Sequence, residues 1–191
     1  MNIQKTSDFH PKNKHKGSYD FPKLLESFPA LAQFVFENQY QNQTIDFSNP
    51  EAVKTLNAAL LKTYYGYSGW NIPEHFLCPP IPGRAEYLHH VADILEETYG
   101  TLQTKNQIKV LDIGVGANCI YPIIGVFEYN WKFVGSEIDK QAFEAAKNNC
   151  NANKKTKENI EIRWQSSKKN ILKNIIQPEE RFDITICNPP F

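Results

Sequence analysis

Hydrophobic and polar positions follow helical spacing in the N-terminal third of this chain. Apolar residues recur three and four positions apart within 21–40 and again within 50–61, so both regions are predicted to form helices with one buried face. Pro29 divides the first region into two helices, and Ser48 or Asn49 provides the cap of the second. Nothing in the apolar face of either predicted helical region indicates a cofactor site.

From residue 85 onward, amphipathic helical segments alternate with short apolar runs. Such alternation predicts an α/β fold with a parallel, doubly wound sheet and right-handed crossovers, joined to a mostly helical N-terminal extension. The strands are expected at 108–113, 131–136, 160–164 and 182–187, and the helices at 85–99, 120–127, 141–151 and 171–176. We expect the helix at 120–127 to be short or irregular, because it contains Pro122 and Gly125.

The stretch 64–84 is rich in tyrosine, tryptophan, proline and glycine, which predicts a long ordered loop. Its rings either fix the loop to the domain or stack on nucleobases. Arg84 stands at the head of the next helix, where it could pair with a ligand carboxylate or a phosphate.

Length and composition narrow the class of protein. The 191 residues suffice for one α/β domain with an extension, and the formal net charge of zero excludes a uniformly basic nucleic-acid-binding surface. Four cysteines without a C-x-x-C pair predict reduced thiols in a cytoplasmic protein and no metal site. We expect no signal peptide and no membrane span.

The predicted strand at 182–187 would lie at the edge of the sheet with its outer side bare. Exposed edges promote aggregation. We therefore expect this chain to be a truncated piece of a longer protein.

The strand at 108–113 leads into a glycine turn formed by Asp112, Gly114 and Gly116. Without a Cβ, glycine lets a ligand approach the backbone closely. A dinucleotide site requires a third glycine where this chain has Cys119, which argues against NAD or FAD. The turn suits a ligand with an amino-acid tail and one nucleoside, and Asp112 could hold the ammonium of that tail.

Further candidates follow the next two strands. Glu137 comes 21 residues after Gly116, the position of a carboxylate that binds ribose hydroxyls. The alternative for the Glu137–Asp139 stretch is a helix cap, and we assign the cap to Asp139. Gln165 and Ser166 follow the third strand, where an adenine edge could be read, although this signal is weak.

The residues Asn188, Pro189, Pro190 and Phe191 carry the most specific pattern. Two prolines fix the backbone at the carboxyl end of a strand, where open α/β sheets bind ligands. The Asn188 side-chain oxygen and the Pro189 carbonyl would accept hydrogen bonds from an exocyclic amine, while Phe191 stacks on its ring. Holding this nucleophile in line with an electrophilic methyl group supplies most of the rate.

The N-terminal segment is basic, with Lys12, Lys14, His15 and Lys16 close together. It is either a solvated terminus or an arm that binds phosphates. We call Lys12, Lys14 and Lys16 the basic arm.

Together these motifs resemble class I S-adenosylmethionine-dependent methyltransferases of the adenine-N6 type. The chain is most similar to the RlmF (YbiN) family of 23S ribosomal RNA adenine-N6 methyltransferases and the related eukaryotic enzyme that methylates U6 small nuclear RNA. The resemblance covers nearly the whole chain. Its most specific stretches are 12–17, 78–84, 112–122, 163–165 and 187–191.

The resemblance implies S-adenosylmethionine as cofactor, bound by Arg84, Gly114, Glu137, Ser166 and Asn188. It implies methylation of the adenine at position 1618 of 23S ribosomal RNA, on protein-free RNA or an early assembly intermediate, by a monomer. Residues 1–84 would bind RNA, and 85–191 would be the first part of the cofactor domain. Since family members continue past Phe191, the truncated chain could be inactive.

Two other functions remain open. A protein glutamine N5-methyltransferase uses a similar Asn-Pro-Pro-aromatic motif, because an amide also presents an NH2 group. An RNA-binding module without turnover is the non-enzymatic alternative. The basic arm and the aromatic loop favour RNA, and a DNA adenine methylase would need a means of extracting a paired base.

Overall fold

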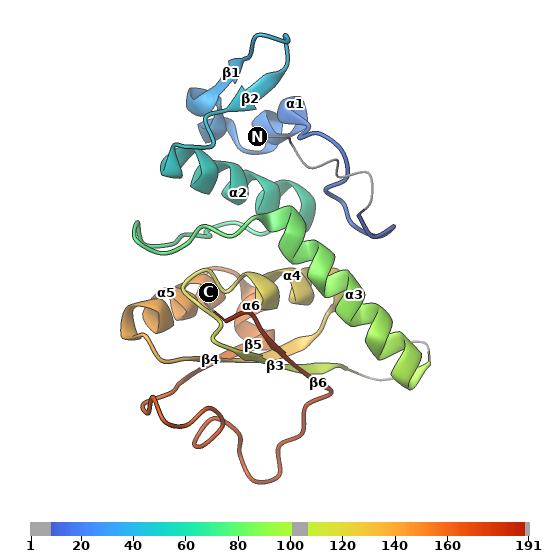
Figure 1. Ribbon diagram of the computed structural model, residues 1–191, viewed down its shortest axis with the longest axis vertical. Helices are drawn as coiled ribbons and strands as arrows, with labels where there is room; N and C mark the ends of the chain where they lie inside the picture. Colours follow the sequence, from blue (N-terminus) through green and yellow to red (C-terminus); the bar gives the residue numbers. More distant parts are fainter. Residues whose placement is uncertain (1–8, 101–106, 190–191) are drawn as a thin grey trace.

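The computed structural model describes residues 9–100 and 107–189, and Figure 1 shows two layers of structure joined by one long helix. The N-terminal elements are α1 (Phe21–Ser27), the 3-10 helix η2 (Pro29–Phe34), the hairpin β1 (Val35–Glu37) and β2 (Gln43–Ile45), and α2 (Pro50–Tyr65). The long helix α3 (Ile81–Tyr99) then runs along the side of the molecule toward the sheet.

Within the described residues, the main sheet is parallel and has the order β5-β4-β3-β6. Its strands are β3 (Lys109–Ile113), β4 (Lys132–Glu137), β5 (Ile160–Trp164) and β6 (Ile184–Cys187). The predicted parallel α/β sheet is thus confirmed. Because the chain runs from β3 outward to β5 and then returns to the other side of β3, the carboxyl ends of β3 and β6 adjoin at a switch point, where such sheets bind ligands.

The two faces of the sheet are covered differently. Val110 and Phe133 belong to the main core, on the side where Figure 1 shows α4 (Ile120–Tyr129), α5 (Lys140–Asn151) and α6 (Lys154–Asn159). Their neighbours Leu111 and Val134 pack against Ile175 on the opposite side. There the segment 165–183 is irregular, so the helix predicted at 171–176 is wrong.

The predicted helix starts are largely confirmed. The Asn49 side chain accepts the backbone N–H groups of the first turn of α2, and Asp139 caps α5 in the same way. The helix predicted from residue 85 begins four residues earlier, at Ile81, because Pro82 fits the first turn of a helix. The helix α4 is regular over ten residues, contrary to expectation, because Pro122 also lies in its first turn, where backbone N–H groups have no intrahelical partner.

The aromatic loop after α2 packs inward. Tyr67 and Trp70 are buried, as is Tyr65 at the end of α2. The hydroxyl of Tyr67 donates to the backbone carbonyl of Asn149 at 2.6 Å, and the indole of Trp70 donates to the carbonyl of Asn118 at 2.8 Å. Tyr67 and Trp70 therefore fix the loop to the sheet domain, and none of the three buried rings is available for stacking on a base.

In residues 9–100 and 107–189, none of the helices combines the length and the apolar character needed to cross a bilayer.

Candidate active site

The glycine turn after β3 is held against the end of β4. Gly114 and Gly116 have φ angles of +73° and +68°, in the left-handed region where an L side chain is strained. The N–H groups of Gly114 and Val115 both donate to the Ser136 carbonyl at 2.9 Å. A Cβ added at Gly114 would meet no other atom within 4 Å, so open space lies over the turn.

Glu137, at the end of β4, binds the same turn. One carboxylate oxygen accepts the Gly116 N–H at 2.9 Å, and the other accepts those of Ile138 and Asp139 at 2.7 and 2.9 Å. A carboxylate offers about four acceptor positions, so three bonds leave capacity for one further donor. Glu137 lines a cavity at the strand ends, and a ribose hydroxyl is a donor of the required kind.

Asp112 is the unusual residue of the site. Its side chain is 1% exposed, and Oδ2 has no hydrogen-bond partner among the described residues. Burial, and secondly the charge of Glu137, raises the pKa of Asp112 to about 7. A buried polar atom without a partner is costly, and a ligand cation beside it would remove that cost.

The cavity beside the turn has a volume of about 190 Å³ and lies at the carboxyl ends of β3, β4 and β5. Gly114 and Glu137 form one side of it, and Ile138 adds an apolar surface. Lys168 and Asn170, which the sequence did not single out, line the side formed by the segment after β5.

Gln165 has a structural role in this segment. Its amide nitrogen donates to the carbonyls of Ile171 and Lys173 at 3.0 and 3.2 Å, and its oxygen accepts the N–H of Ser167 at 3.0 Å. With these bonds its carboxamide holds the segment in shape. Ser166 is exposed and is not among the residues that line the cavity.

Arg84 lies in the first turn of α3 and contacts Tyr121 at the start of α4. Its Nη1 donates to the Tyr121 hydroxyl at 3.1 Å, and its guanidinium lies 5.6 Å from the ring centroid. The rings of Tyr121 and Tyr87 are 5.2 Å apart. Burial, followed by the charges of Asp112 and Cys187, raises the pKa of Tyr87, which indicates that this cluster lies near both strand ends.

The edge strand β6 brings Asn188 to the same place. Cys187 pairs with Ile113 in the parallel register, so Asn188 and Gly114 are the first residues beyond two adjacent strand ends. Asn188 and Pro189 are exposed. Pro190 and Phe191, the other two residues of the predicted motif, lie outside the described residues.

The basic arm packs on the far ends of α3 and α4. Lys12 and Lys14 pair with Glu96 and Glu128 at 3.5 and 2.6 Å, and Lys16 donates to the Pro11 carbonyl at 2.8 Å. All three lysines are exposed.

His15 differs from the basic arm, because its ring is buried and lies 2.9 Å from the Tyr65 hydroxyl. Burial and the charge of Lys14 lower the pKa of His15 to about 4, so the ring is neutral at pH 7. It cannot serve as the surface cation for RNA that its position beside three lysines suggested.

One carboxamide that sequence reasoning missed organises the surroundings of the turn. Asn149 on α5 donates to the carbonyls of Asn71 and Ala117 at 2.8 and 3.0 Å, and it accepts the Asn71 N–H at 3.0 Å. It thereby joins the aromatic loop to the glycine turn. Its partners are far away in sequence, so no local pattern could have identified it.

Solved structures with the same fold include the N-terminal domain of human METTL16 in complex with SAH. The TM-score is 0.85 at 32% identity, over 96% of this chain and 70% of that one. The human METTL16 catalytic domain in complex with a MAT2A 3′UTR hairpin gives a TM-score of 0.82 at 33% identity, over 96% and 60%. The sheet and the glycine turn thus form the Rossmann-like fold of a methyltransferase.

The sequence comparisons identify the family. A family model described as RNA methyltransferase matches residues 3–191. Proteins named ribosomal RNA large subunit methyltransferase F are 52% identical in Pseudomonas entomophila and 54% identical in Cytophaga hutchinsonii, each over 95% of this chain. The chain belongs to this RNA methyltransferase family. It spans 58% and 57% of the length of these two relatives.

Proposed function

We propose that this chain carries the cofactor site of an S-adenosylmethionine-dependent ribosomal RNA adenine-N6 methyltransferase. The observation that carries the proposal is Asp112, a buried carboxyl group whose Oδ2 has no partner among the described residues, beside a glycine turn and next to a strand that is followed directly by Asn188. The names of the relatives support ribosomal RNA as the substrate. The family resemblance supports position 1618 of 23S RNA. The proposal also includes a monomer, and the cysteine pattern supports action in the cytoplasm.

The residues present fit this cofactor. Asp112 offers a buried anion to an ammonium group, and the open space over Gly114 admits an amino-acid tail against the backbone. Glu137 retains acceptor capacity for one ribose hydroxyl and shares its cavity with the apolar Ile138, which suits an adenine face. Arg84 contacts Tyr121, and the charge of Asp112 contributes to the raised pKa of both Tyr121 and Tyr87, so all of these residues lie in one region. Arg84 would pair with the carboxylate of the tail. Ser166 belongs to the proposal by family resemblance only.

The proposed chemistry requires little from the protein beyond positioning. S-adenosylmethionine supplies an electrophilic methyl group. The oxygens of Asn188 and Pro189 would accept hydrogen bonds from the exocyclic amine of the target adenine and orient its lone pair. The nitrogen would gain the methyl group as the bond between that methyl and the cofactor sulfur breaks, leaving S-adenosylhomocysteine, and it would then release one proton to water. Because this proton becomes acidic only as the new bond forms, no titratable base is needed. Phe191 would stack on the adenine, next to Pro190.

We propose that residues 1–84 bind RNA and that 85–191 contribute the first part of the cofactor domain. The exposed lysines of the basic arm are the groups that a polyanion would select, and their carboxylate partners could exchange for phosphates. A protein glutamine N5-methyltransferase remains the second candidate, because the Asn-Pro-Pro-aromatic motif accepts any NH2 group. The matching RNA family model favours RNA.

A tritium-transfer assay tests the proposal. The full-length protein and labelled S-adenosylmethionine are incubated with protein-free 23S RNA from cells lacking the enzyme, with duplex DNA, or with a release-factor protein. We expect label in RNA that digests to N6-methyladenosine. Label in the protein substrate would establish the glutamine alternative, and cofactor binding without any labelled product would leave an RNA-binding module.

Asn188→Ala tests the role of the motif. We expect this variant to lose methyl transfer while it retains most of its cofactor affinity, because Asp112 and Glu137 are unchanged. Thr185→Ala, at an exposed position of the same strand, is the matched control and should methylate normally. Turnover by Asn188→Ala at the wild-type rate would refute the assigned role.

A further inference from the structure

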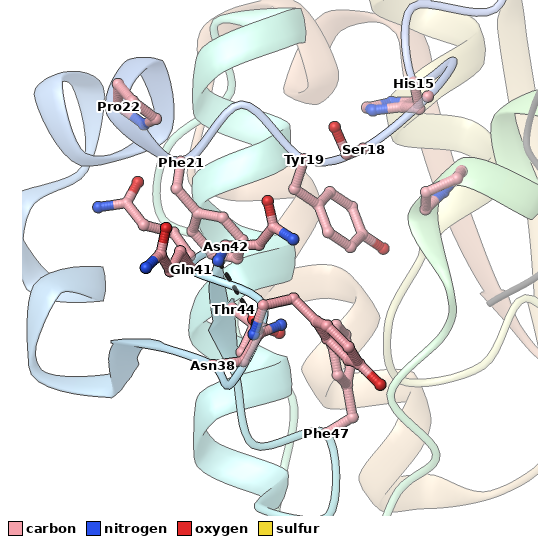
Figure 2. A pocket seen from close by; sticks show the side chains of 14 residues that line it. His15, Ser18, Tyr19, Phe21, Pro22, Asn38, Gln41, Asn42, Thr44 and Phe47 are labelled. Carbon is pink, nitrogen blue, oxygen red and sulfur yellow. Dashed lines mark hydrogen bonds between the residues drawn. The ribbon is translucent and has the colours of Figure 1, made fainter. Parts of the chain in front are cut away.

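A second and larger cavity lies in the N-terminal layer, away from the glycine turn. Its volume is about 640 Å³, and it lies between the segment 15–22 and the β1–β2 hairpin (Figure 2). Figure 2 shows Tyr19 and Phe21 on the first side, facing Asn38, Asn42 and Phe47 on the second. The proposed cofactor site uses none of these residues.

Aromatic side chains form much of this cavity. The rings of Tyr19 and Phe47 are nearly parallel, with centroids 6.3 Å apart and an interplanar angle of 29°. Phe47 is nevertheless 54% exposed, and Tyr40 on the hairpin turn is 74% exposed. Rings of this size usually dominate cores and interfaces, so two exposed rings lining one cavity indicate a surface that binds a flat, apolar-faced partner.

The polar part of the lining consists of carboxamides. Asn38 is used within the turn, because its oxygen accepts the N–H groups of Tyr40 and Asn42 at 2.9 and 3.1 Å. In the described part of the chain, the side chains of Gln41, Asn42 and Gln43 have no hydrogen-bond partner. Carboxamides present a donor and an acceptor together, as does the Watson–Crick edge of a base.

One lining residue independently indicates a missing partner. His15 is 7% exposed, and its Nδ1 has no hydrogen-bond partner within the described residues, whereas its Nε2 lies 2.9 Å from the Tyr65 hydroxyl. A buried ring nitrogen without a partner is costly unless a ligand or water satisfies it.

The electrostatics of the cavity permit an anionic ligand. None of the described residues that line it is acidic. The nearby carboxylates of Asp20 and Asp46 are used locally, accepting the N–H groups of Lys23 and Ser48. Lys16 of the basic arm directly precedes the lining residue Gly17, so a cation is available for the phosphate of a ligand.

We propose that this cavity binds an unstacked nucleobase of single-stranded RNA, on the same strand as the methylated adenine. The inference rests on the proposed function. Aromatic rings would stack on the base, and the carboxamides and His15 would contact its polar edge. Pro82, which also lines the cavity, is two residues before Arg84 in the first turn of α3, about 3 Å along the helix axis. One helical turn therefore adjoins both the cavity and the cofactor site.

Fluorescence of 2-aminopurine, which is quenched when the base stacks, tests this proposal directly. The probe is a short single-stranded RNA with 2-aminopurine at its centre, and the same RNA annealed to its complement serves as the stacked reference. We expect quenching with the single strand, and affinity weakened about tenfold by either Phe47→Ala or Tyr40→Ala, as is typical for the loss of one base–aromatic contact. Phe47→Trp should restore it.

Phe36→Ala is the matched control, because Phe36 is on the same hairpin, is 51% exposed, and does not line the cavity. Its RNA affinity should equal that of the wild type. Tyr40→Ala is the variant expected to fold normally, since the Tyr40 ring is 74% exposed and contacts no other ring within the described residues. Wild-type quenching and affinity in both Phe47→Ala and Tyr40→Ala, or equal loss in Phe36→Ala, would overturn the proposal.

The test separates this proposal from the proposed function. If the tritium assay labels RNA and the cavity variants bind RNA normally, only the cavity assignment fails. If no substrate is labelled and the variants still lose quenching relative to the control, the cavity assignment stands and the methyltransferase proposal fails.

Discussion

The buried carboxylate of Asp112 predicts that cofactor binding depends on pH in a defined direction. The pKa of Asp112 is about 7 in the unliganded protein, so the group is largely protonated below pH 7. A ligand ammonium binds the ionised form. The apparent affinity should therefore fall as pH falls, approaching tenfold per pH unit well below pH 7. Between pH 7.5 and 5.5 the ionised fraction, and hence the affinity, falls about 25-fold.

Isothermal titration calorimetry with S-adenosylhomocysteine measures this linkage. At pH 6, binding should release roughly 0.9 proton, detected as a difference between buffers of unlike ionisation enthalpy. The range stays below pH 7.5 because the ligand α-amino group itself loses its proton near pH 8. Asp112→Asn should bind more weakly at pH 7.5 and release no proton.

Glu137→Gln is an informative comparison. The charge of Glu137 is the second cause of the raised pKa of Asp112, so this variant should shift the midpoint of the pH dependence downward. At pH 6 it should release fewer protons than the wild type but, unlike Asp112→Asn, should still release some. The assignment of Asp112 would be refuted if Asp112→Asn released as many protons as the wild type. It would also be refuted if the wild-type affinity did not change between pH 5.5 and 7.5.

The same shift affects stability without ligand. The folded pKa of about 7 exceeds the ordinary value of 3.8, so the folded state binds the proton more tightly than the unfolded state. The contribution of Asp112 to the free energy of unfolding therefore falls as pH rises from about 4 to 7. The difference in unfolding midpoint between wild type and Asp112→Asn, followed against pH, isolates this contribution.

Two further predictions concern the helix α4 and the basic arm. Gly125→Ala should lower the free energy of unfolding by about 1–3 kcal/mol, measured by urea denaturation, because the added Cβ would clash with the Phe133 ring. Gly83→Ala in α3, where a Cβ meets nothing within 4 Å, should be neutral or stabilising, and equal losses in both variants would contradict the packing argument. Replacing all three lysines of the basic arm with glutamine should reduce the salt dependence of RNA binding by up to about 0.7 per lost phosphate contact; an unchanged slope would exclude the arm from the RNA site.

The sheet was predictable because its signals are local. Short apolar runs located the strands, and β5 has the predicted bounds, Ile160–Trp164. Capping residues such as Asn49 and Asp139 act within three positions of themselves, which makes them readable without a structure.

Elements held by distant contacts were not predictable. The hairpin β1–β2 lies partly in a region with helical spacing, yet Val35 pairs with Ile45 across the hairpin turn. The charged helix α6 buries only Thr156, so it has no apolar stripe to recognise. The helix expected at 171–176 fails because Ile175 packs directly on the sheet and Gln165 binds the surrounding backbone carbonyls.

For the candidate site, residue types and spacing identified the residues at the strand ends but not the hydrogen bonds that these residues make. The sequence places Asp112, Glu137 and Asn188 at one edge of a parallel sheet. It does not show that Glu137 already binds three backbone N–H groups or that Asp112 has an oxygen without a partner. Both facts depend on the packing around each oxygen.

The hydrogen bonds of Asn149 have a thermodynamic consequence. This one carboxamide binds the backbone of both the aromatic loop at Asn71 and the glycine turn at Ala117, so a displacement of either segment strains the other. If cofactor binding reshapes the turn, the free energy of that change is shared with the loop that leads to α3 and the N-terminal layer. Thermodynamic linkage then requires reciprocity. If bound cofactor changes the RNA affinity by some factor, bound RNA must change the cofactor affinity by the same factor.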